Sequence, residues 1–266
     1  MWGERTNVPM TAKDHDDTVR RSFRRQTGLF AGDDSPFARR PETPSPTAWL
    51  GPLDASMVVL DVACGAAHVA EEVAPAVRQV VGVDLTPELL ALGAARLREA
   101  GVTNVLLQQG AATTLPFVDE SFDVVCCRSA LHHFGDPVAA VTEMARVCRA
   151  GGRVVVSDLV VPDPALRDRF DAVHRSLDPS HGRAFTADEI ADLLATHVGP
   201  LGHREQRGPG ALPLDAIVTD VADRAAVLQA LDAELGGGPA TGFLPARTDG
   251  TLTVSFASVV VHASRP

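Results

Sequence analysis

VVLDVACGAAHVAEEVAPAVRQVVGVD, residues 58–84, is the stretch that decides the fold. Its first five residues are apolar except for one aspartate and predict a buried strand, and residues 79–84 predict a second strand of the same kind. Small residues follow the first strand and lead into a helix over residues 66–73. A strand, a tight turn, a helix and a second strand make up the unit from which parallel sheets are built.

The same alternation continues toward the C-terminus. Thr86 and Pro87 are residue types typical of a helix N-cap and first helical position, and this helix is expected to end near Ala100. Asp136 opens another helix, and β-branched residues near the end of the chain predict a final strand. We therefore expect an α/β fold. Its further strands are predicted at residues 104–108, 122–127, 153–157 and 252–262.

The ends of the chain are patterned less regularly. Residues 1–17 are polar and predict no stable structure, residues 18–30 predict a helix, and residues 32–46 predict a loop rich in Gly, Pro and Ser. Beyond Pro162 the apolar spacing predicts helices that are joined by longer connections. These helices are expected at residues 163–174, 186–195 and within 214–235.

The composition excludes several classes of function. The chain has 266 residues, a formal net charge of −10 and 34 acidic against 24 basic residues, so we expect no nucleic-acid partner. The local basic run at residues 20–25 is interpreted as a helix face. We expect no membrane span, because no apolar run approaches about 18 residues. Four cysteines without zinc spacing indicate a reducing cytoplasm, and a homo-oligomer is compatible with these features.

The turn after the first strand is suited to a ligand. In an open parallel sheet, ligands bind outside the carboxyl ends of the strands, where small residues let them approach the backbone. Ala63, Gly65 and Ala67 supply such a turn. Asp84 ends the second strand about 20 residues later, where an acid can accept the hydroxyl groups of a ribose. The sequence therefore predicts a nucleoside site.

Two nucleoside cofactors compete for this turn. A dinucleotide site requires G-x-G-x-x-G, and residues 65–70 match only its first glycine. Asp61 would repel a pyrophosphate, whereas it could face the cationic methionine end of S-adenosylmethionine (SAM). A tight turn that needs only small residues, with no ligand, is the remaining alternative.

Several segments, in order, resemble the class I methyltransferases, specifically the ubiquinone/menaquinone-biosynthesis group (methyltransferase type 11). The matching residues are 58–65, 80–87, 115–123, 130–134, 136–137 and, in outline, 151–155. Residues 22–26 with Phe30 resemble the N-terminal segment that lies over the cofactor in this group. The resemblance covers roughly residues 20–160 and implies SAM as the cofactor.

The resemblance also implies which residues hold SAM. The methionine end would meet three residues of the turn and, through the backbone, one residue after the fourth strand. The ribose would meet the acid that ends the second strand, with the next residue beside the adenine, and three residues after the third strand would line the adenine. The residues at the methionine end are thus Asp61, Ala63, Gly65 and, through its backbone, Arg128. Asp84 would hold the ribose, with Leu85 beside the adenine, and Gly110, Ala111 and Ala112 would line the adenine.

Two positions depart from the group. Ala67 stands where a second glycine is frequent, and Ala111 stands where an aspartate commonly bonds the adenine amine. The loss of one such bond weakens binding by about 1 kcal/mol. These departures leave open a methyltransferase fold that binds SAM or another ligand without methylating.

Three histidines are candidates for catalysis. His132 and His133 follow the fourth strand on the ligand side of the sheet, where a neutral imidazole could take a proton; the alternative is that one packs and the other contacts the N-terminal helix. His181 lies with His174 and Asp178 in a polar cluster that could equally be a helix-capping turn. No fixed spacing such as HExxH is present, so no metal site is predicted.

These features together predict a SAM-dependent methyltransferase that acts on carbon or oxygen of an apolar small molecule. The expected architecture is a Rossmann-like, doubly wound, mostly parallel sheet with an antiparallel C-terminal strand and helices on both faces. Residues 1–46 would form an N-terminal helical lid segment and residues 47–266 the methyltransferase domain, with an acceptor-pocket insertion at about 162–250. The apolar candidates for lid and pocket are Phe23, Phe30, Phe37, Trp49, Phe170, Leu214 and Phe243.

Overall fold

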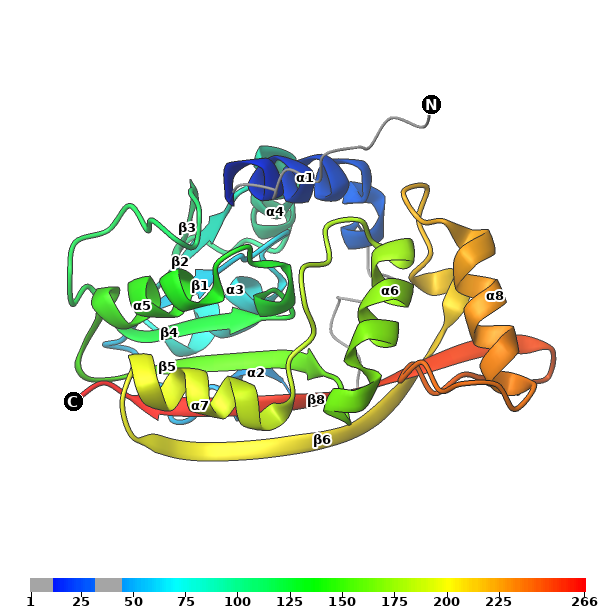
Figure 1. Cartoon of the computed structure of the whole chain (residues 1–266). Helices are drawn as coiled ribbons and strands as arrows, with labels where there is room; N and C mark the ends of the chain where they lie inside the picture. Colours follow the sequence, from blue (N-terminus) through cyan, green and yellow to red (C-terminus); the bar gives the residue numbers. More distant parts are fainter. Residues whose placement is uncertain (1–11, 32–44) are drawn as a thin grey trace, which may run out of the picture.

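Within residues 12–31 and 45–266, which the computed structural model describes, eight strands form one sheet in the order β3-β2-β1-β4-β5-β8-β6, with β7 also paired to β8 (Figure 1). The first five strands of this order are parallel neighbours, and β8 runs antiparallel to β5, β6 and β7. The expected mostly parallel sheet is confirmed. The strands are β1 Val58–Val62, β2 Gln79–Asp84, β3 Val105–Gln109, β4 Phe122–Arg128, β5 Cys148–Val160, β6 Leu201–Pro213, β7 Ala246–Thr248 and β8 Thr251–Ser264.

Helices cover both faces of the sheet. On one face Met144 of α5 and Ile190 of α7 are buried against the strands, and on the other Val69 of α3 and Leu97 of α4 are buried. The central strands β1, β2 and β4 are therefore buried on both sides, as their uninterrupted apolar runs predict. The helices are α1 Ala12–Arg25, α2 Pro46–Trp49, α3 His68–Val73, α4 Pro87–Glu99, α5 Pro137–Val147, α6 Arg167–Leu177, α7 Ala187–His197 and α8 Arg224–Leu235, and the short 3₁₀ helices include η1 Thr27–Phe30, η3 Leu131–His133 and η5 Leu214–Ala216.

Strand β6 was not predicted. It is the edge strand of the sheet, its residues are mostly exposed, and its sequence LGHREQRGPGALP carries polar residues, glycines and prolines. Edge strands of this composition resist pairing with other chains, so they lack the apolar alternation by which a strand is recognised. The loosely patterned region after Pro162 therefore contains a strand of the main sheet.

The N-terminal helix begins earlier than expected. The polar residues 12–17 are helical and not unstructured, because α1 is anchored by tertiary contacts such as that between His15 Nε2 and the carbonyl of His133, 2.6 Å apart. Figure 1 shows α1 across the end of the sheet, near α4. Most of the expected loop at residues 32–46, with Phe37, lies outside the described residues. None of the described helices has the length and apolar character needed to cross a membrane.

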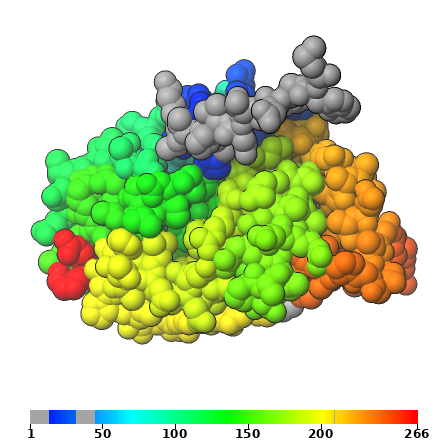
Figure 2. Space-filling view, viewed as in Figure 1, coloured from blue at the N-terminus to red at the C-terminus, as the bar shows by residue number. Residues whose placement is uncertain are grey.

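The C-terminal part builds a second core of its own. Beside Val254, near the first residues of β8, four large side chains are fully buried together: Phe170, Leu214, Leu231 and Phe243. Phe170, Leu214 and Phe243 were candidates for the lid and pocket, but they pack with one another instead; Trp49 likewise packs in the core under α2 and α3. Figure 2 shows the yellow-green surface of α6 between the green surface near α5 and the orange surface of α8.

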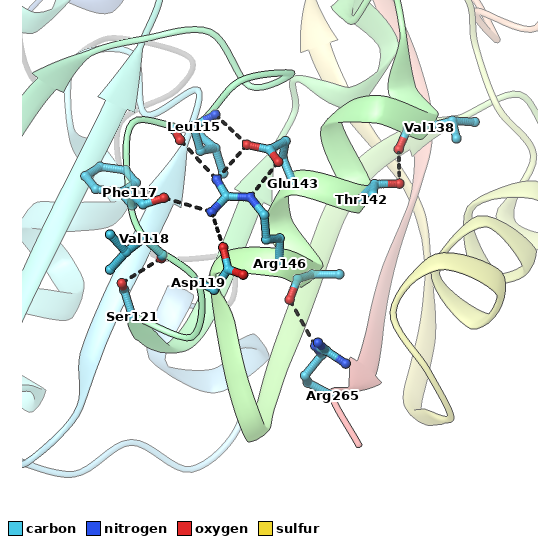
Figure 3. A network of polar contacts seen from close by, with 11 residues as sticks. Leu115, Phe117, Val118, Asp119, Ser121, Val138, Thr142, Glu143, Arg146 and Arg265 are labelled. Atoms are coloured by element: carbon cyan, nitrogen blue, oxygen red, sulfur yellow. Dashed lines mark hydrogen bonds and ion pairs between the residues drawn. The ribbon is translucent and has the colours of Figure 1, made fainter.

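A partly exposed arginine network fixes the segment before β4 (Figure 3). Arg146 of α5 donates hydrogen bonds to the carbonyl oxygens of Leu115 and Phe117 at 3.1 and 2.8 Å and to the carboxylate of Asp119 at 2.7 Å. Glu143 accepts two bonds from the same guanidinium, each of 2.7 Å, and one from the backbone N–H of Leu115 at 2.8 Å. The network therefore ties α5 to the chain that follows residues 110–112.

Replacing Arg146 by methionine is expected to lower the free energy of unfolding by about 1–3 kcal/mol. The change keeps the aliphatic length but leaves carbonyl and carboxylate acceptors without their donor. Urea denaturation measures the change, with the exposed Arg98→Met on α4 as the matched control. An equal effect of the two substitutions would show that the network contributes nothing to stability.

Candidate functional site

A cavity of about 380 Å³ opens at the carboxyl ends of β1, β2 and β4. Its volume is in the range of small-molecule sites. All nine residues expected to hold SAM line it: Asp61, Ala63, Gly65, Asp84, Leu85, Gly110, Ala111, Ala112 and Arg128. They come from four separate segments, and the sheet brings them together.

The turn between β1 and α3 has a left-handed backbone at three positions. Ala63, Gly65 and Ala67 have φ angles of 56°, 55° and 63°. A Cβ atom built on Gly65 would meet no atom within 4 Å, so this backbone faces open space. Below the turn, a Cβ on Gly93 of α4 would lie 3.1 Å from the Cβ of Ala67. The turn is therefore packed from α4 and open toward the cavity.

Asp84 fixes this turn from the end of β2. Its Oδ2 accepts a hydrogen bond from the backbone N–H of Gly65 at 2.8 Å, and its Oδ1 accepts one from the N–H of Thr86 at 2.8 Å. Burial raises the pKa of Asp84, and these two backbone bonds act against the rise. Each carboxylate oxygen has a second lone pair. Asp84 can therefore orient the turn and still accept ligand hydroxyls.

Asp61, the acid inside β1, has an unsatisfied oxygen. Its side chain is 1% exposed, and Oδ2 has no hydrogen-bond donor among the described residues. Burial raises the pKa of Asp61 to about 7, and the nearby Asp84 adds to the rise while Arg128 opposes it. A buried carboxylate oxygen without a donor is costly unless a polar or cationic group meets it. The amino group at the methionine end of SAM is such a group, so the site fits SAM.

The segment after β3 forms the opposite wall. The backbone N–H of Gly110 donates to the carbonyl of Asp84 at 3.0 Å, and Ala111 forms an isolated bridge with Thr114. A Cβ on Gly110 would approach Pro116 Cδ to 3.2 Å, which leaves little space for a side chain. Only a methyl group projects from Ala111, so this residue offers no side-chain hydrogen bond. Leu85 lies half-buried at the end of β2.

His132 and His133 line the same cavity just after β4. His132 Nδ1 lies 2.6 Å from Asp158 Oδ1, and the backbone N–H of His132 donates to Asp158 Oδ2 at 3.2 Å. Burial lowers the pKa of His132 well below 6.5 and raises that of Asp158 to about 7. The ring centroids of His132 and His133 lie 4.1 Å apart. The ring of Phe23 in α1 meets that of His133 edge-on, with 5.0 Å between centroids.

His133 is oriented by a chain of hydrogen bonds. Its Nδ1 lies 3.1 Å from Ser180 Oγ and 3.2 Å from the Ser180 carbonyl oxygen. The Ser180 hydroxyl donates to Asp178 Oδ1 at 2.6 Å, and Ser22 of α1 donates to the same oxygen at 2.8 Å. Since the serine proton is used by Asp178, His133 Nδ1 carries the hydrogen, and Nε2 keeps its lone pair.

Asp178 supplies the negative charge behind this chain. Burial raises its pKa, but the positive charge of His133 in its protonated form and the bonds from Ser180 and Ser22 outweigh burial and hold the pKa of Asp178 well below its ordinary value. Asp178 also accepts the backbone N–H of Ser180 at 2.9 Å. Asp178 therefore shapes a turn and supports His133, whereas the N-cap of α7 is Thr186 and not Asp178 or Ser180.

The third catalytic candidate lies behind the cavity wall. His181 does not line the cavity; its Nε2 lies 2.7 Å from Asp171 Oδ1 of α6. His174 does line it, stacked on His181 with 4.0 Å between ring centroids.

The sequence did not point to Asp158 or Asp171. Asp158 could have been recognised, because a carboxylate within the apolar strand β5 needs a hydrogen-bond partner when it is buried.

The chain is similar to known methyltransferases. Residues 60–156 match the family model described as a methyltransferase domain. A relative named uncharacterized methyltransferase YcgJ from Bacillus subtilis (strain 168) is 43% identical over 140 residues, which are 52% of this chain and 55% of the relative. A demethylmenaquinone methyltransferase of Listeria monocytogenes serotype 4b is 36% identical over 132 residues, 48% of this chain and 55% of that protein. The chain thus spans about half the length of the curated relatives it matches.

Solved structures resemble more of the chain. The crystal structure of YcgJ superposes with a TM-score of 0.70 at 28% identity, over 80% of this chain and 94% of that one. A putative methyltransferase from Bacillus halodurans C-125 gives a TM-score of 0.74 at 29% identity, over 83% and 97%. The [4+2]-cyclase SpnF, at 16% identity and a TM-score of 0.65, shares the fold.

Proposed function

Because the chain carries a methyltransferase domain of the SAM-dependent class I kind, we propose that it transfers a methyl group to carbon or oxygen of an apolar small molecule. The observation that carries this proposal is a single cavity that joins the nucleoside-type site at Asp61 and Asp84 to His133. A reducing cytoplasm is the compartment that suits its four free, buried cysteines.

The acceptor is proposed to be apolar because of what lines the rest of the cavity. Beyond the residues at the strand ends, its walls include Phe23, Leu177, Leu212, Ile217 and Phe256. Apolar walls with a few polar groups are typical of sites that orient a small apolar ligand. The demethylmenaquinone methyltransferases among the relatives are named for an acceptor of this kind, which supports the same class here.

When bound, SAM supplies an electrophilic methyl group on a sulfonium. The protein contributes by alignment, by exclusion of water and by handling a proton. We assign the proton to His133, whose Nε2 lone pair is fixed by the bonds at Nδ1. His133 Nε2 would accept the proton of an acceptor hydroxyl or acidic carbon, while the methyl group leaves the sulfonium for that atom and S-adenosylhomocysteine is the leaving group. Helix α1 shields the step, because Phe23 packs against the His133 ring.

Binding of SAM or S-adenosylhomocysteine is expected to stabilise the protein by about 2–4 kcal/mol at saturating excess. A thermal-shift titration with each ligand measures this. Asp84→Ala should abolish the shift, because it removes both the ribose acceptor and the clamp on Gly65. Asp215→Ala, at an exposed ion pair with Arg224, is the matched control and should leave the shift unchanged. An unshifted wild-type protein would exclude SAM as the ligand.

The non-methylating alternative gives a different result. SAM would then bind but stay unconsumed with every apolar acceptor offered, as followed by the formation of S-adenosylhomocysteine. Turnover with any carbon or oxygen acceptor would exclude that alternative.

A further inference from the structure

Three buried histidines from separate segments meet at the cavity wall. His132 comes from η3, His174 from α6, and His181 from the loop after α6. The ring centroid of His132 lies 5.5 Å from that of His174 and 5.7 Å from that of His181. One ring nitrogen from each of the three lies within 4.8 Å of the other two. No sequence spacing predicted this cluster, because the fold assembles it from distant positions.

Two of the rings are held by buried carboxylates. Asp158 Oδ1 lies 2.6 Å from His132 Nδ1, and Asp171 Oδ1 lies 2.7 Å from His181 Nε2. A carboxylate accepts a proton from the nitrogen it faces, so the hydrogens are assigned to these two nitrogens and the opposite ones keep lone pairs. A histidine that donates one N–H to a carboxylate and presents its other nitrogen is the usual support of a metal ligand.

Two ring nitrogens of the cluster lack hydrogen-bond partners among the described residues. His174 Nδ1 and His181 Nδ1 are buried, and neither has a hydrogen-bond partner among the described residues. Since His181 gives the hydrogen on Nε2 to Asp171, its Nδ1 carries a lone pair. Neutral imidazole is the form that binds metal ions. A buried nitrogen lone pair without a hydrogen-bond donor is costly. A metal ion that accepts the lone pair would remove this cost.

We propose that His132, His174 and His181 bind a divalent transition metal ion. The three imidazole donors favour Zn²⁺. Three imidazoles without thiolate suit a four-coordinate zinc ion with one open position. The rings of His174 and His181 lie stacked, 11° from parallel, so one of them must turn about its Cβ–Cγ bond to bring both lone pairs to one ion. His132 and His174 line the cavity, so the open position faces it.

The metal site also indicates that the methyl acceptor carries an oxygen that can bind the ion. This inference rests on the proposed function. An ion at this place would coordinate an oxygen of the acceptor, such as a phenol or quinol hydroxyl, next to the ring of His133 at 4.1 Å from that of His132. Coordination lowers the pKa of a bound hydroxyl. His133 remains free to take the proton, because it is not a member of the three-histidine cluster.

Zinc binding can be tested without SAM or acceptor. The untagged full chain is stripped with a chelator and titrated with Zn²⁺ in a calorimeter, and with Co²⁺ while the visible spectrum is recorded. We expect one ion per chain and the intense absorption of four-coordinate Co²⁺. His174→Ala should weaken Zn²⁺ binding at least 100-fold. Asp171→Asn, which keeps every ligand, should weaken it about 10–100-fold.

His203→Ala is the matched control, since His203 lies on β6 with its side chain 52% exposed and paired with Glu205. It should bind Zn²⁺ as the wild type does. Circular dichroism and the SAM thermal shift report whether each variant is folded; if His174→Ala unfolds, Asp171→Asn decides. Absence of stoichiometric binding to the wild type, or equal binding by the decisive variant, would overturn the proposal. Zinc binding without any SAM shift would uphold the metal site and reject the proposed function.

Discussion

Replacing His133 by asparagine is expected to lower kcat for methyl transfer by about 10²–10⁴, the range attributed to general-base catalysis, with SAM affinity unchanged. His133 faces the cavity beyond the turn that would hold SAM, so its loss removes a proton acceptor and no cofactor contact. Asparagine can still donate to the Ser180 carbonyl. The variant therefore separates proton transfer from packing.

The measurement is formation of S-adenosylhomocysteine with a panel of apolar phenols and hydroquinones. Ser180→Ala is expected to give a smaller loss, because it removes the link to Asp178 but leaves the backbone carbonyl as a partner of His133. His203→Asn is the matched surface control. A full rate in His133→Asn, with the cofactor bound normally, would remove His133 from the mechanism.

Asp61→Asn is expected to stabilise the ligand-free protein at pH 8 and at the same time to weaken SAM binding about 10–100-fold. Burial raises the pKa of Asp61 from 3.8 to about 7. Between these values the folded protein retains a proton that the unfolded chain has lost, so the free energy of unfolding falls as pH rises from about 4 to 7. Asparagine carries no charge, which removes this loss and returns about 2–4 kcal/mol at pH 8.

The affinity for SAM should depend on pH in the opposite direction. The ionised carboxylate attracts the cationic amino group, so wild-type affinity should rise up to about tenfold per pH unit below 7 and level off above it. The loss in Asp61→Asn corresponds to one charge-assisted hydrogen bond of about 1.5–3 kcal/mol. Calorimetric titrations with S-adenosylhomocysteine from pH 5.5 to about 8 measure both effects. A wild-type profile that is flat with pH, matching that of the variant, would show that Asp61 does not face the amino group.

Local rules were sufficient for the centre of the fold. Buried strands such as β1 and β2 consist of apolar residues, and the small residues between β1 and α3 predicted the tight turn. The edge strand β6 escaped because its residues are selected for exposure. Helix α1 was placed too late in the chain because its first turn is polar and is held by a contact over 118 residues, from His15 to His133.

The proposed cofactor site and the proposed catalytic histidines differ in how far they could be predicted. Asp61 lies one residue before the end of β1 and Asp84 ends the neighbouring β2, so pattern and topology place them together. The roles of His132, His133 and His181 depend on Asp158, Asp178 and Asp171, each brought from another element by tertiary packing. His181 was expected to take part in catalysis, yet it lies behind the wall, since its direction is set by Asp171 of α6.

The alanines at 63 and 67 have a consequence for how such proteins are detected. Left-handed backbone costs an alanine about 1–2 kcal/mol, and both residues adopt it. Their conformation is imposed by β1, β2 and α4 around them, so the surrounding scaffold substitutes for the missing glycine. Searches that count glycines in this loop would therefore overlook members of the fold whose glycines have drifted to alanine while the shape of the loop stays the same.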